Sequence, residues 1–411
     1  MSEQPVIVLD PTGSDHHAED RALRARGPAA RVDILGVSAW AVTDPVLLKR
    51  LLTSPDVSKD AARHWPALAG TAATWPLALW VTADNMFTAY GTDHRRLRRM
   101  IAPAFSARRI EALRPGVEST VTALLDALAA LPAGETADLR ARLAHPLPIA
   151  VISRLMGVPE SRRDGFRARV DGIFDTTLTA EQAAANGAAV FADLEELIAL
   201  KRREPADDMT SLLVAARDEE GDGGGLSDTE LRDTLLLMIS AGYETTVNVI
   251  DQAVTALLRD PAQLARVRAG QADWSDVVEE TLRHEPAVKH LPLRYAVQDV
   301  PLPGGQIIPR GDAILASYAA ANRHPDRHGP SADRFDVTRP VKDHMAFGYG
   351  VHFCLGAPLA RMEVATALRR LFDRFPGIEL AVPADRLRPL PSLISNGHLT
   401  LPVRLRPTQG P

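Results

Sequence analysis

The sequence contains one cysteine, Cys354, among its 411 residues. An internal disulfide is therefore excluded, and the fold does not depend on an oxidising compartment. The N-terminal stretch has no cationic segment followed by an apolar one, and no run of about 18 apolar residues occurs anywhere in the chain. We therefore predict a cytoplasmic protein without a membrane span.

A strong charge imbalance is missing as well. The 47 Lys and Arg residues against 52 Asp and Glu give a net charge of −5, so nucleic acid is not expected as the main partner. With 45% hydrophobic and 24% charged residues the composition is that of a globular protein with a large core. We expect residues 1–411 to form a single domain, in which residues 1–29 are loosely ordered.

The surroundings of Cys354 are unusual for an inert buried thiol. Glycines at 348, 350 and 356 flank it, and glycine lets a backbone adopt positive φ and approach a flat ligand closely. An amphipathic run over 359–375, preceded by Pro358, predicts a helix directly after the cysteine. Free N–H groups at a helix start favour a thiolate over a thiol. This stretch therefore suits an anionic sulfur ligand.

A second unusual stretch lies within the longest predicted helix. Ser227 and Glu230 form a capping box, and the absence of proline up to Pro261 predicts one helix over 228–259. Its centre reads AGYETT, in which Gly242 costs helix stability and Thr245 can return its hydroxyl to the carbonyl at 241. Small side chains at Ala241 and Gly242 would allow close approach to a bound group. A helix-packing glycine beside a surface Glu244 is the simpler alternative.

Two polar pairs at helical spacing are ambiguous by themselves. His94 and Arg98 are four apart in the basic run HRRLRR, which is also typical of a solvated face or of a DNA-binding patch. Glu280 and Arg283 are three apart, after a cap at Asp273 or Ser275, and this spacing is common in surface ion pairs.

The rest of the chain reads as mostly helical, with short strands. We expect a hairpin around 31–42, a helix over 45–52 capped by Asp44, and an irregular, tryptophan-rich segment over 60–92. Further helices are predicted at 110–131, 139–156, 160–178 and 180–203; strands are predicted within 291–314 and at 399–405.

Together these stretches resemble a known family. The pattern FGxGxHxCxG, from Phe347 to Gly356, is similar to the haem-binding loop of the cytochrome P450 superfamily. AGxET at 241–245, ExxR at 280–283 and HxxxR at 94–98 match its other motifs in the expected order. The resemblance implies a mainly α fold with small β-sheets, in which haem b lies between the long central helix and the helix after the cysteine loop.

The resemblance also implies residue roles. Cys354 would be the axial ligand of the haem iron, and Thr245 and Glu244 would relay protons. Further cofactor contacts would come from His94, Arg98, Arg294, His352, Phe347, Gly348, Gly356, Ala241 and Gly242. Glu280, Arg283 and Arg334 would form a buried structural triad. The substrate pocket would include Met86, Phe87, Met238, Thr246, Val288, Leu291, Leu293 and Ile394, the last from a turn over 393–396.

The activity implied is monooxygenation, most simply hydroxylation, of a hydrophobic steroid, macrolide or polyketide-like molecule. The chain has no nucleotide or flavin fingerprint and no cysteine set for an iron–sulfur cluster. Electrons would therefore come from a ferredoxin or a flavodoxin-type donor with an NAD(P)H-dependent reductase. A peroxide-driven or oxidative-coupling enzyme of the same fold, and a non-catalytic haem-binding protein, remain alternatives.

Overall fold

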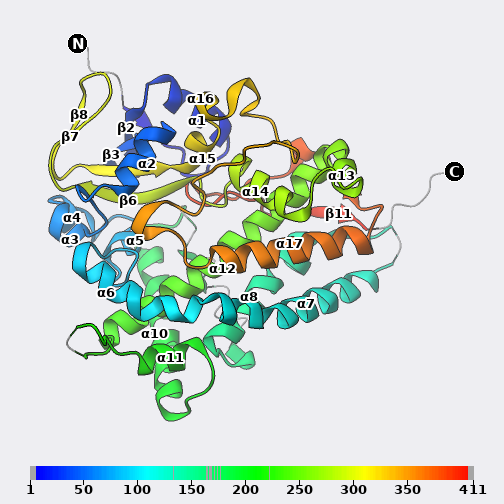
Figure 1. Ribbon diagram of the computed structural model, residues 1–411, viewed down its shortest axis with the longest axis horizontal. Helices are drawn as coiled ribbons and strands as arrows, with labels where there is room; N and C mark the ends of the chain where they lie inside the picture. The colour runs from blue at the N-terminus through cyan, green and yellow to red at the C-terminus, as the bar shows by residue number, and fades with distance from the viewer. Residues whose placement is uncertain are drawn as a thin grey trace.

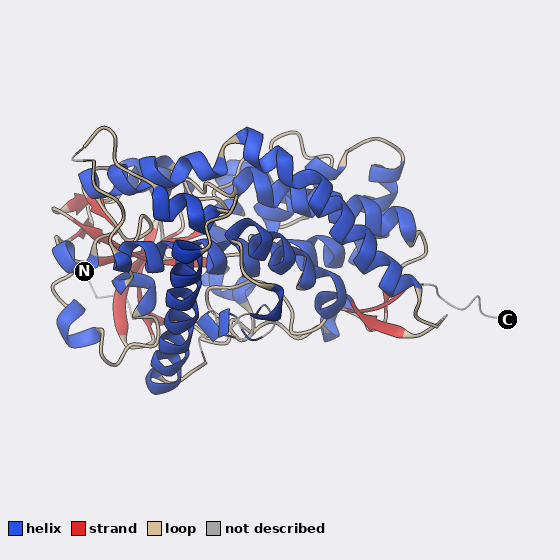
Figure 2. Ribbon diagram, turned by 90° about the horizontal axis from the view of Figure 1, so that it is seen from below, coloured by secondary structure: helices blue, strands red, loops and turns tan. Residues whose placement is uncertain are grey.

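The computed structural model describes residues 6–405, apart from 133, 163–164, 166–168, 171, 174, 176 and 222. Eight of the nineteen residues of the helix expected over 160–178 lie outside the described residues. The other long helices of the prediction are present, and helices form most of the described structure (Figure 2).

The organising element is α12, Asp228–Arg259, whose bounds agree with the predicted helix. Ser227 Oγ accepts from the N–H of Glu230 at 3.1 Å, and the N–H of Ser227 donates to the Glu230 carboxylate at 2.8 Å, so the predicted capping box is confirmed. Most of its residues from Leu231 to Leu257 are buried, because four helices pack against it, namely α8 (Pro146–Met156), α10 (Ala180–Arg203), α14 (Trp274–His284) and α17 (Ala357–Arg374). Figure 1 shows α17, in orange, lying alongside α12.

Around α12 lie two groups of helices, the second of which includes α17. On the side of α8 they are α6 Gly91–Ile101, α7 Ala107–Ala129, a π-helical turn Arg140–Ala144, α8 Pro146–Met156, α10 Ala180–Arg203 and α11 Met209–Ala215. Later in the chain come α13 Pro261–Arg268, α14 Trp274–His284, α15 Tyr318–Asn322, α16 Pro325–His328 and α17 Ala357–Arg374.

The larger sheet lies near the N-terminal end of the molecule (Figure 2). Its strand order is β1 Ile7–Val8, β2 Ala29–Ile34, β3 Val37–Val42, β9 Ala313–Ser317, β6 His290–Ala296 and β4 Val57–Ser58. The predicted hairpin is the antiparallel pair β2 and β3. Smaller sheets are formed by β10 Glu379–Leu380, β11 Pro402–Arg404 and β5 Thr136–Asp138, and by β7 Val300–Pro301 and β8 Ile307–Ile308.

The tryptophan-rich segment packs against the larger sheet through short helices. These are α3 Ala61–His64, α4 Leu68–Thr71 and α5 Leu79–Thr82, and they follow α2 Pro45–Thr53. Trp65 and Trp75 are buried, and Trp65 stacks on Tyr295 of β6 with ring centroids 5.4 Å apart. Two of the three tryptophans in this segment therefore fill core.

The expectation that residues 1–29 are loosely ordered is wrong for the described part, residues 6–29. β1 pairs with β2, and helix α1, His16–Ala25, packs on α15. The side chains of His16 and His17 contact the Glu285 carboxylate at 3.1 and 2.8 Å, and buried Asp20 pairs with Arg323. These partners lie far away in the sequence, so local composition did not reveal them.

Candidate active site

The cysteine loop folds back on itself before α17. The N–H of Cys354 donates to the Phe347 carbonyl at 3.0 Å, and Gly348 and Gly350 adopt φ of +72° and +73°. A Cβ on Gly350 would lie 2.7 Å from the Leu52 carbonyl oxygen. Glycine is therefore required there by both conformation and space. Gly356, by contrast, has a φ of −79° at the start of α17, so positive φ is not its reason.

The Cys354 side chain opens into a large cavity between α12 and α17. Its empty volume, open solvent included, is about 1400 Å³, and most of its lining residues are apolar. From α12 the lining includes Met238, Ala241, Gly242, Thr245, Thr246 and Val249. From the cysteine loop and α17 it includes Phe347, Gly348, His352, Cys354, Gly356, Leu359, Ala360 and Glu363. The two stretches singled out in the sequence thus face one space.

The wall formed by α12 has the predicted local structure. Thr245 Oγ1 donates to the Ala241 carbonyl at 2.6 Å, as expected for a threonine that loosens a helix beside a groove. A Cβ on Gly242 would lie 3.0 Å from Cδ1 of Ile152 on α8. Gly242 therefore serves helix packing as well as lining the cavity.

One corner of the cavity gathers cationic and imidazole side chains from four segments. It contains His94 and Arg98 from α6, Arg294 from β6, His352 from the cysteine loop and Lys59 after β4. The rings of His94 and His352 lie 4.2 Å apart, and Arg98 Nη2 donates to the Phe353 carbonyl at 2.8 Å. Nε2 of His94 and Nε of Arg294 are buried and have no hydrogen-bond partner among the described residues.

The electrostatics of this corner favour an anion. Burial and the charges of Arg98 and Arg294 lower the pKa of His94 to about 4. Burial, together with Arg294 and His94, lowers the pKa of His352 far below its ordinary value. Burial and the charge of Arg294 also lower the pKa of Lys59 well below its ordinary value. Among the described residues, the Lys59 ammonium has no salt-bridge partner.

The thiol itself responds to two opposed influences. Burial raises the pKa of Cys354, whereas the backbone N–H groups of Gly356 and Ala357, and then the charge of Arg98, lower it. The helix start therefore acts on the sulfur in the predicted direction. The Cys354 side chain is exposed to the open cavity, but the protein that surrounds the cavity raises the pKa of the thiol more than the helix start lowers it. A cationic metal centre at the sulfur would reverse this balance, because a coordinating thiol is deprotonated.

The ExxR pair is buried, but its third member is not the predicted one. The Glu280 carboxylate accepts from Arg283 Nε at 2.7 Å and from Arg283 Nη2 at 2.8 Å. The further arginine on Glu280 is Arg339, with Nε at 3.3 Å. The side chain of Arg334 is exposed, and only its backbone carbonyl joins the network, accepting from Arg283 and Arg339. The assignment of Arg334 is therefore wrong at the level of the side chain.

Glu244 is buried, yet it does not line the cavity. Its carboxylate accepts from Arg140 Nη2 at 3.3 Å and from Asn248 Nδ2 at 3.1 Å. Arg140 continues to Asp251 at 3.0 Å, and the Asp251 carboxylate contacts the His398 ring at 2.8 Å. Glu244 thus belongs to a charged cluster behind α12, while Thr245 faces the cavity.

Six of the eight predicted pocket residues line the cavity, namely Met86, Phe87, Met238, Thr246, Val288 and Leu291. Leu293 and Ile394 do not. Both are buried in the core beneath the larger sheet. The register of β6 against β9 shifts between Leu291 and Arg294, so Leu293 leaves the face that Leu291 occupies.

Three polar lining residues were missed by the sequence reasoning. The only sequence signal for Lys59 is its position after a short strand. Tyr318 lies at the start of α15, beside Arg294. Glu363 had a detectable signal, because it shares a helical face with Leu359 and Ala360. Its Oε2 is buried without a hydrogen-bond partner among the described residues, and burial raises its pKa to about 8.

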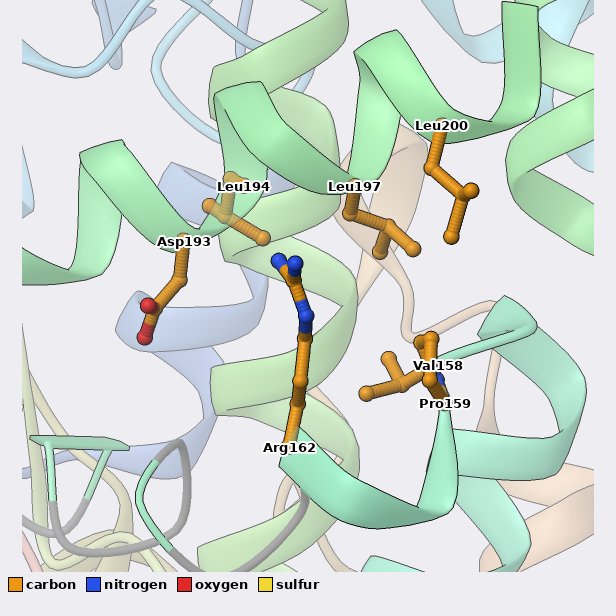
Figure 3. Close-up of a pocket in the computed structure, with 7 residues that line it drawn as sticks. All are labelled: Val158, Pro159, Arg162, Asp193, Leu194, Leu197 and Leu200. Carbon is orange, nitrogen blue, oxygen red and sulfur yellow. The ribbon is translucent and has the colours of Figure 1, made fainter. Parts of the chain in front are cut away.

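A second hollow, between α10 and the segment around Val158, is much smaller (Figure 3). Arg162 points into it between Asp193 and Leu197. Its empty volume is about 340 Å³, against about 1400 Å³ for the large cavity, and both volumes include open solvent. The part that the centre of a water-sized sphere can occupy is about 20 Å³, against about 240 Å³ in the large cavity, so it has room for about one water molecule.

The large cavity fits a flat, mostly apolar group that carries anionic substituents at one edge. Its walls are helices α12 and α17, a sulfur ligand stands at one side, and one corner holds nitrogen atoms of His94 and Arg294 that have no partner among the described residues. Haem has this chemistry, with an iron for the sulfur and two propionates for the cations. The fold and the site define a haem-thiolate oxidoreductase.

The comparisons with known proteins agree with this class. The Cytochrome P450 family model matches residues 194–271 and 274–390. The 2-hydroxy-5-methyl-1-naphthoate 7-hydroxylase of Streptomyces carzinostaticus is 42% identical over 401 residues, which cover 97% of each chain. The 6-deoxyerythronolide B hydroxylase of Saccharopolyspora erythraea is 36% identical over 98% of this chain and 100% of its own. The solved structure of CYP154A1 from Streptomyces coelicolor A3(2) is 68% identical, with a TM-score of 0.94 over 97% of this chain and 100% of that chain.

This chain belongs to the cytochrome P450 family, and it is a haem-iron monooxygenase. Among the described residues no helix is both long and apolar enough to cross a membrane.

Proposed function

We propose that this enzyme uses haem b to hydroxylate a medium-sized or large hydrophobic molecule of the polyketide, macrolide or steroid type. The observation that carries the proposal is the apolar wall that faces Cys354 and Thr245, built from residues such as Met86, Met238 and Val288. Such a wall binds its ligand by shape and apolar contact. The names of the naphthoate and erythronolide hydroxylases support a bulky ring-containing substrate.

The residues of the chain divide the remaining tasks. Haem, when bound, supplies the activation of O₂ and the insertion of one oxygen atom. Cys354 would hold the iron from the α17 side, while His94, Arg98, Arg294 and His352 would neutralise the propionates. The small residues Gly348, Gly356, Ala241 and Gly242 would leave room for the macrocycle between the two helices, and the Phe347 ring would contact it.

Proton delivery is assigned to Thr245 and Glu244. The Thr245 hydroxyl faces the cavity and donates its hydrogen to the Ala241 carbonyl. Its oxygen can therefore accept a hydrogen bond from a water molecule in the cavity. Glu244 is adjacent in sequence but is held by Arg140 behind the helix. It would therefore act by exchanging Arg140 for a water or for Thr245 during the cycle.

Electrons would come from a ferredoxin or a flavodoxin-type protein and an NAD(P)H-dependent reductase, since the chain has no motif for a second redox group. The cytoplasmic location expected from the lone cysteine is part of the same proposal.

The test has a spectroscopic and a catalytic part. The reduced, CO-treated holoprotein should show the Soret band of thiolate ligation, Cys354→Ala should lose it, and Thr245→Ala, the matched control, should keep it. A spectral screen of steroids, macrolides and aromatic polyketides should then find ligands that displace the iron-bound water. Turnover of those ligands with peroxide alone, and not with NADPH and redox partners, would refute the proposed electron source.

A further inference from the structure

Lys59 and Lys289 are two buried lysines in contrasting environments. Each side chain belongs to a residue only 2% exposed. Nζ of Lys289 donates to the Ser392 carbonyl at 2.6 Å, and the charges of Glu19, Asp20, Glu285 and Asp10 all act on it favourably. Lys289 is therefore a compensated buried cation.

Lys59 has no such compensation. Its Nζ donates to the Pro292 carbonyl at 3.3 Å and lies 3.5 Å from the centroid of the Phe87 ring. The adjacent carboxylate, Asp60, is used by Arg63 and by the cap of α3. The charged group that acts on Lys59 is Arg294, which is itself a cation.

Strand pairing fixes this arrangement. β4 pairs with β6 through Val57 and Ala296 and through Ser58 and Tyr295, which places Lys59 beside the part of β6 that carries Arg294. Two cations are thus held together in a nearly carboxylate-free corner of an apolar cavity. Burying an ammonium without an anion is costly, and one carbonyl and one aromatic ring return only part of that cost.

We propose that Lys59 binds a carboxylate that enters this cavity. The inference rests on the proposed function, because that function supplies the two sources of such a carboxylate. One source is a haem propionate, reached from the side of Arg294. The other is an acidic substituent of the substrate, reached from the side of Phe87.

The experiment compares wild-type holoprotein with Lys59→Met, Lys59→Arg and the exposed-lysine control Lys49→Met. Haem transfer to apomyoglobin measures the propionate source. If Lys59 holds a propionate, Lys59→Met should release haem about tenfold faster or more, which is the scale of one charge-assisted hydrogen bond. Lys59→Arg should restore most of the retention, and Lys49→Met should match wild type.

Spectral titration with 2-naphthoic acid and its methyl ester measures the substrate source. If Lys59 binds a substrate carboxylate, Lys59→Met should weaken binding of the acid about tenfold and leave the ester unchanged. Denaturation of the holoproteins tells whether the Lys59 ammonium is paired, because the sign of the stability change differs between the two cases. Lys59→Met should lower stability if the ammonium is paired, and raise it if the ammonium is buried without an anion.

Unchanged haem transfer, together with acid and ester titrations that do not differ between wild type and Lys59→Met, would overturn the inference. If Lys59→Met yields no folded protein, Lys59→Gln carries the same comparisons. The thiolate band of the CO complex separates the two levels of the argument. Its absence in wild type refutes the haem-thiolate site itself, whereas its presence with unaffected Lys59 variants refutes only the role of Lys59.

Discussion

The two arginines near Glu280 provide a sharp test of the structural network. Arg339 and Arg334 are five residues apart in one irregular segment, yet their side chains differ completely in environment. The Arg339 guanidinium is buried and donates to Glu280, to the Ser331 hydroxyl and carbonyl, and to the Arg334 carbonyl. The Arg334 side chain is exposed, and its carbonyl is present whatever side chain the residue carries.

The expected free-energy changes follow from this difference. Removing one partner from a fully buried ion pair costs about 3–5 kcal/mol. Arg283 still neutralises Glu280 when Arg339 is gone, so we expect Arg339→Ala to lie near the lower limit, at about 3 kcal/mol. An exposed side chain without specific contacts contributes within about 0.5 kcal/mol, so Arg334→Ala should be nearly neutral.

Equilibrium urea denaturation of the holoproteins, followed by circular dichroism and by the amplitude of the thiolate–CO band, measures both effects. Arg339→Ala should lower the midpoint strongly and lose haem at lower urea, because residues 332–339 lead into the segment before the cysteine loop. Equal loss of stability in Arg334→Ala would show that the side-chain assignment is reversed. Such a result would restore the residue expected from the sequence.

Two further predictions concern the Glu363 carboxyl and the Thr245 hydroxyl of the cavity. Burial raises the pKa of Glu363 from 4.5 to about 8. Between these two pH values the folded protein keeps a proton on Glu363 that the unfolded chain releases. The contribution of Glu363 to the free energy of unfolding therefore falls as pH rises from about 4.5 to 8. Glu363→Gln should flatten that part of the stability–pH curve in haem-depleted protein, and an unchanged slope would show that Glu363 does not titrate in this way. Thr245→Ala should bind haem and ligand nearly as wild type does but divert electrons to peroxide, measured as hydroxylated product per NADPH consumed; tight coupling in the variant would remove Thr245 from proton delivery.

Local signals in the sequence were sufficient for the long elements. The bounds of α12 follow from a capping box at Ser227, a proline at 261 and an apolar sequence between them, all of which act within a few residues. The cysteine loop was equally accessible, because the need for glycine at 348 and 350 is a local backbone property. The helix bounds and the glycine-rich setting of Cys354 could thus be predicted from local sequence, whereas the haem-binding role of the loop came from the family resemblance.

Side-chain direction in irregular or shifted segments could not be predicted in the same way. Strict alternation along β6 places Leu291 and Leu293 on one face, but the register shift places Leu291 and Arg294 at the cavity. The choice of Arg339 over Arg334 depends on how residues 331–339 wrap around Glu280, and no periodic pattern describes that path. Lys59 reaches the cavity because β4 pairs with a strand more than 230 residues away.

Glu244 and Glu363 show that a sequence motif does not determine which way its side chains point. In AGYET, Glu244 stands next to Thr245, but adjacent residues on a helix point about 100° apart. Ala241, Gly242, Thr245 and Val249 form the cavity stripe of α12, while Glu244, Asn248 and Asp251 form another stripe that faces Arg140. The helical spacing of 244, 248 and 251 is present in the sequence, but the sequence analysis did not use it and expected Glu244 either to relay protons or to lie on the surface. Glu363 on α17 instead lines the cavity, and its Oε2 has no hydrogen-bond partner among the described residues. Because Arg140 holds the Glu244 carboxylate, the proposed proton delivery through Glu244 would require Arg140 to release it.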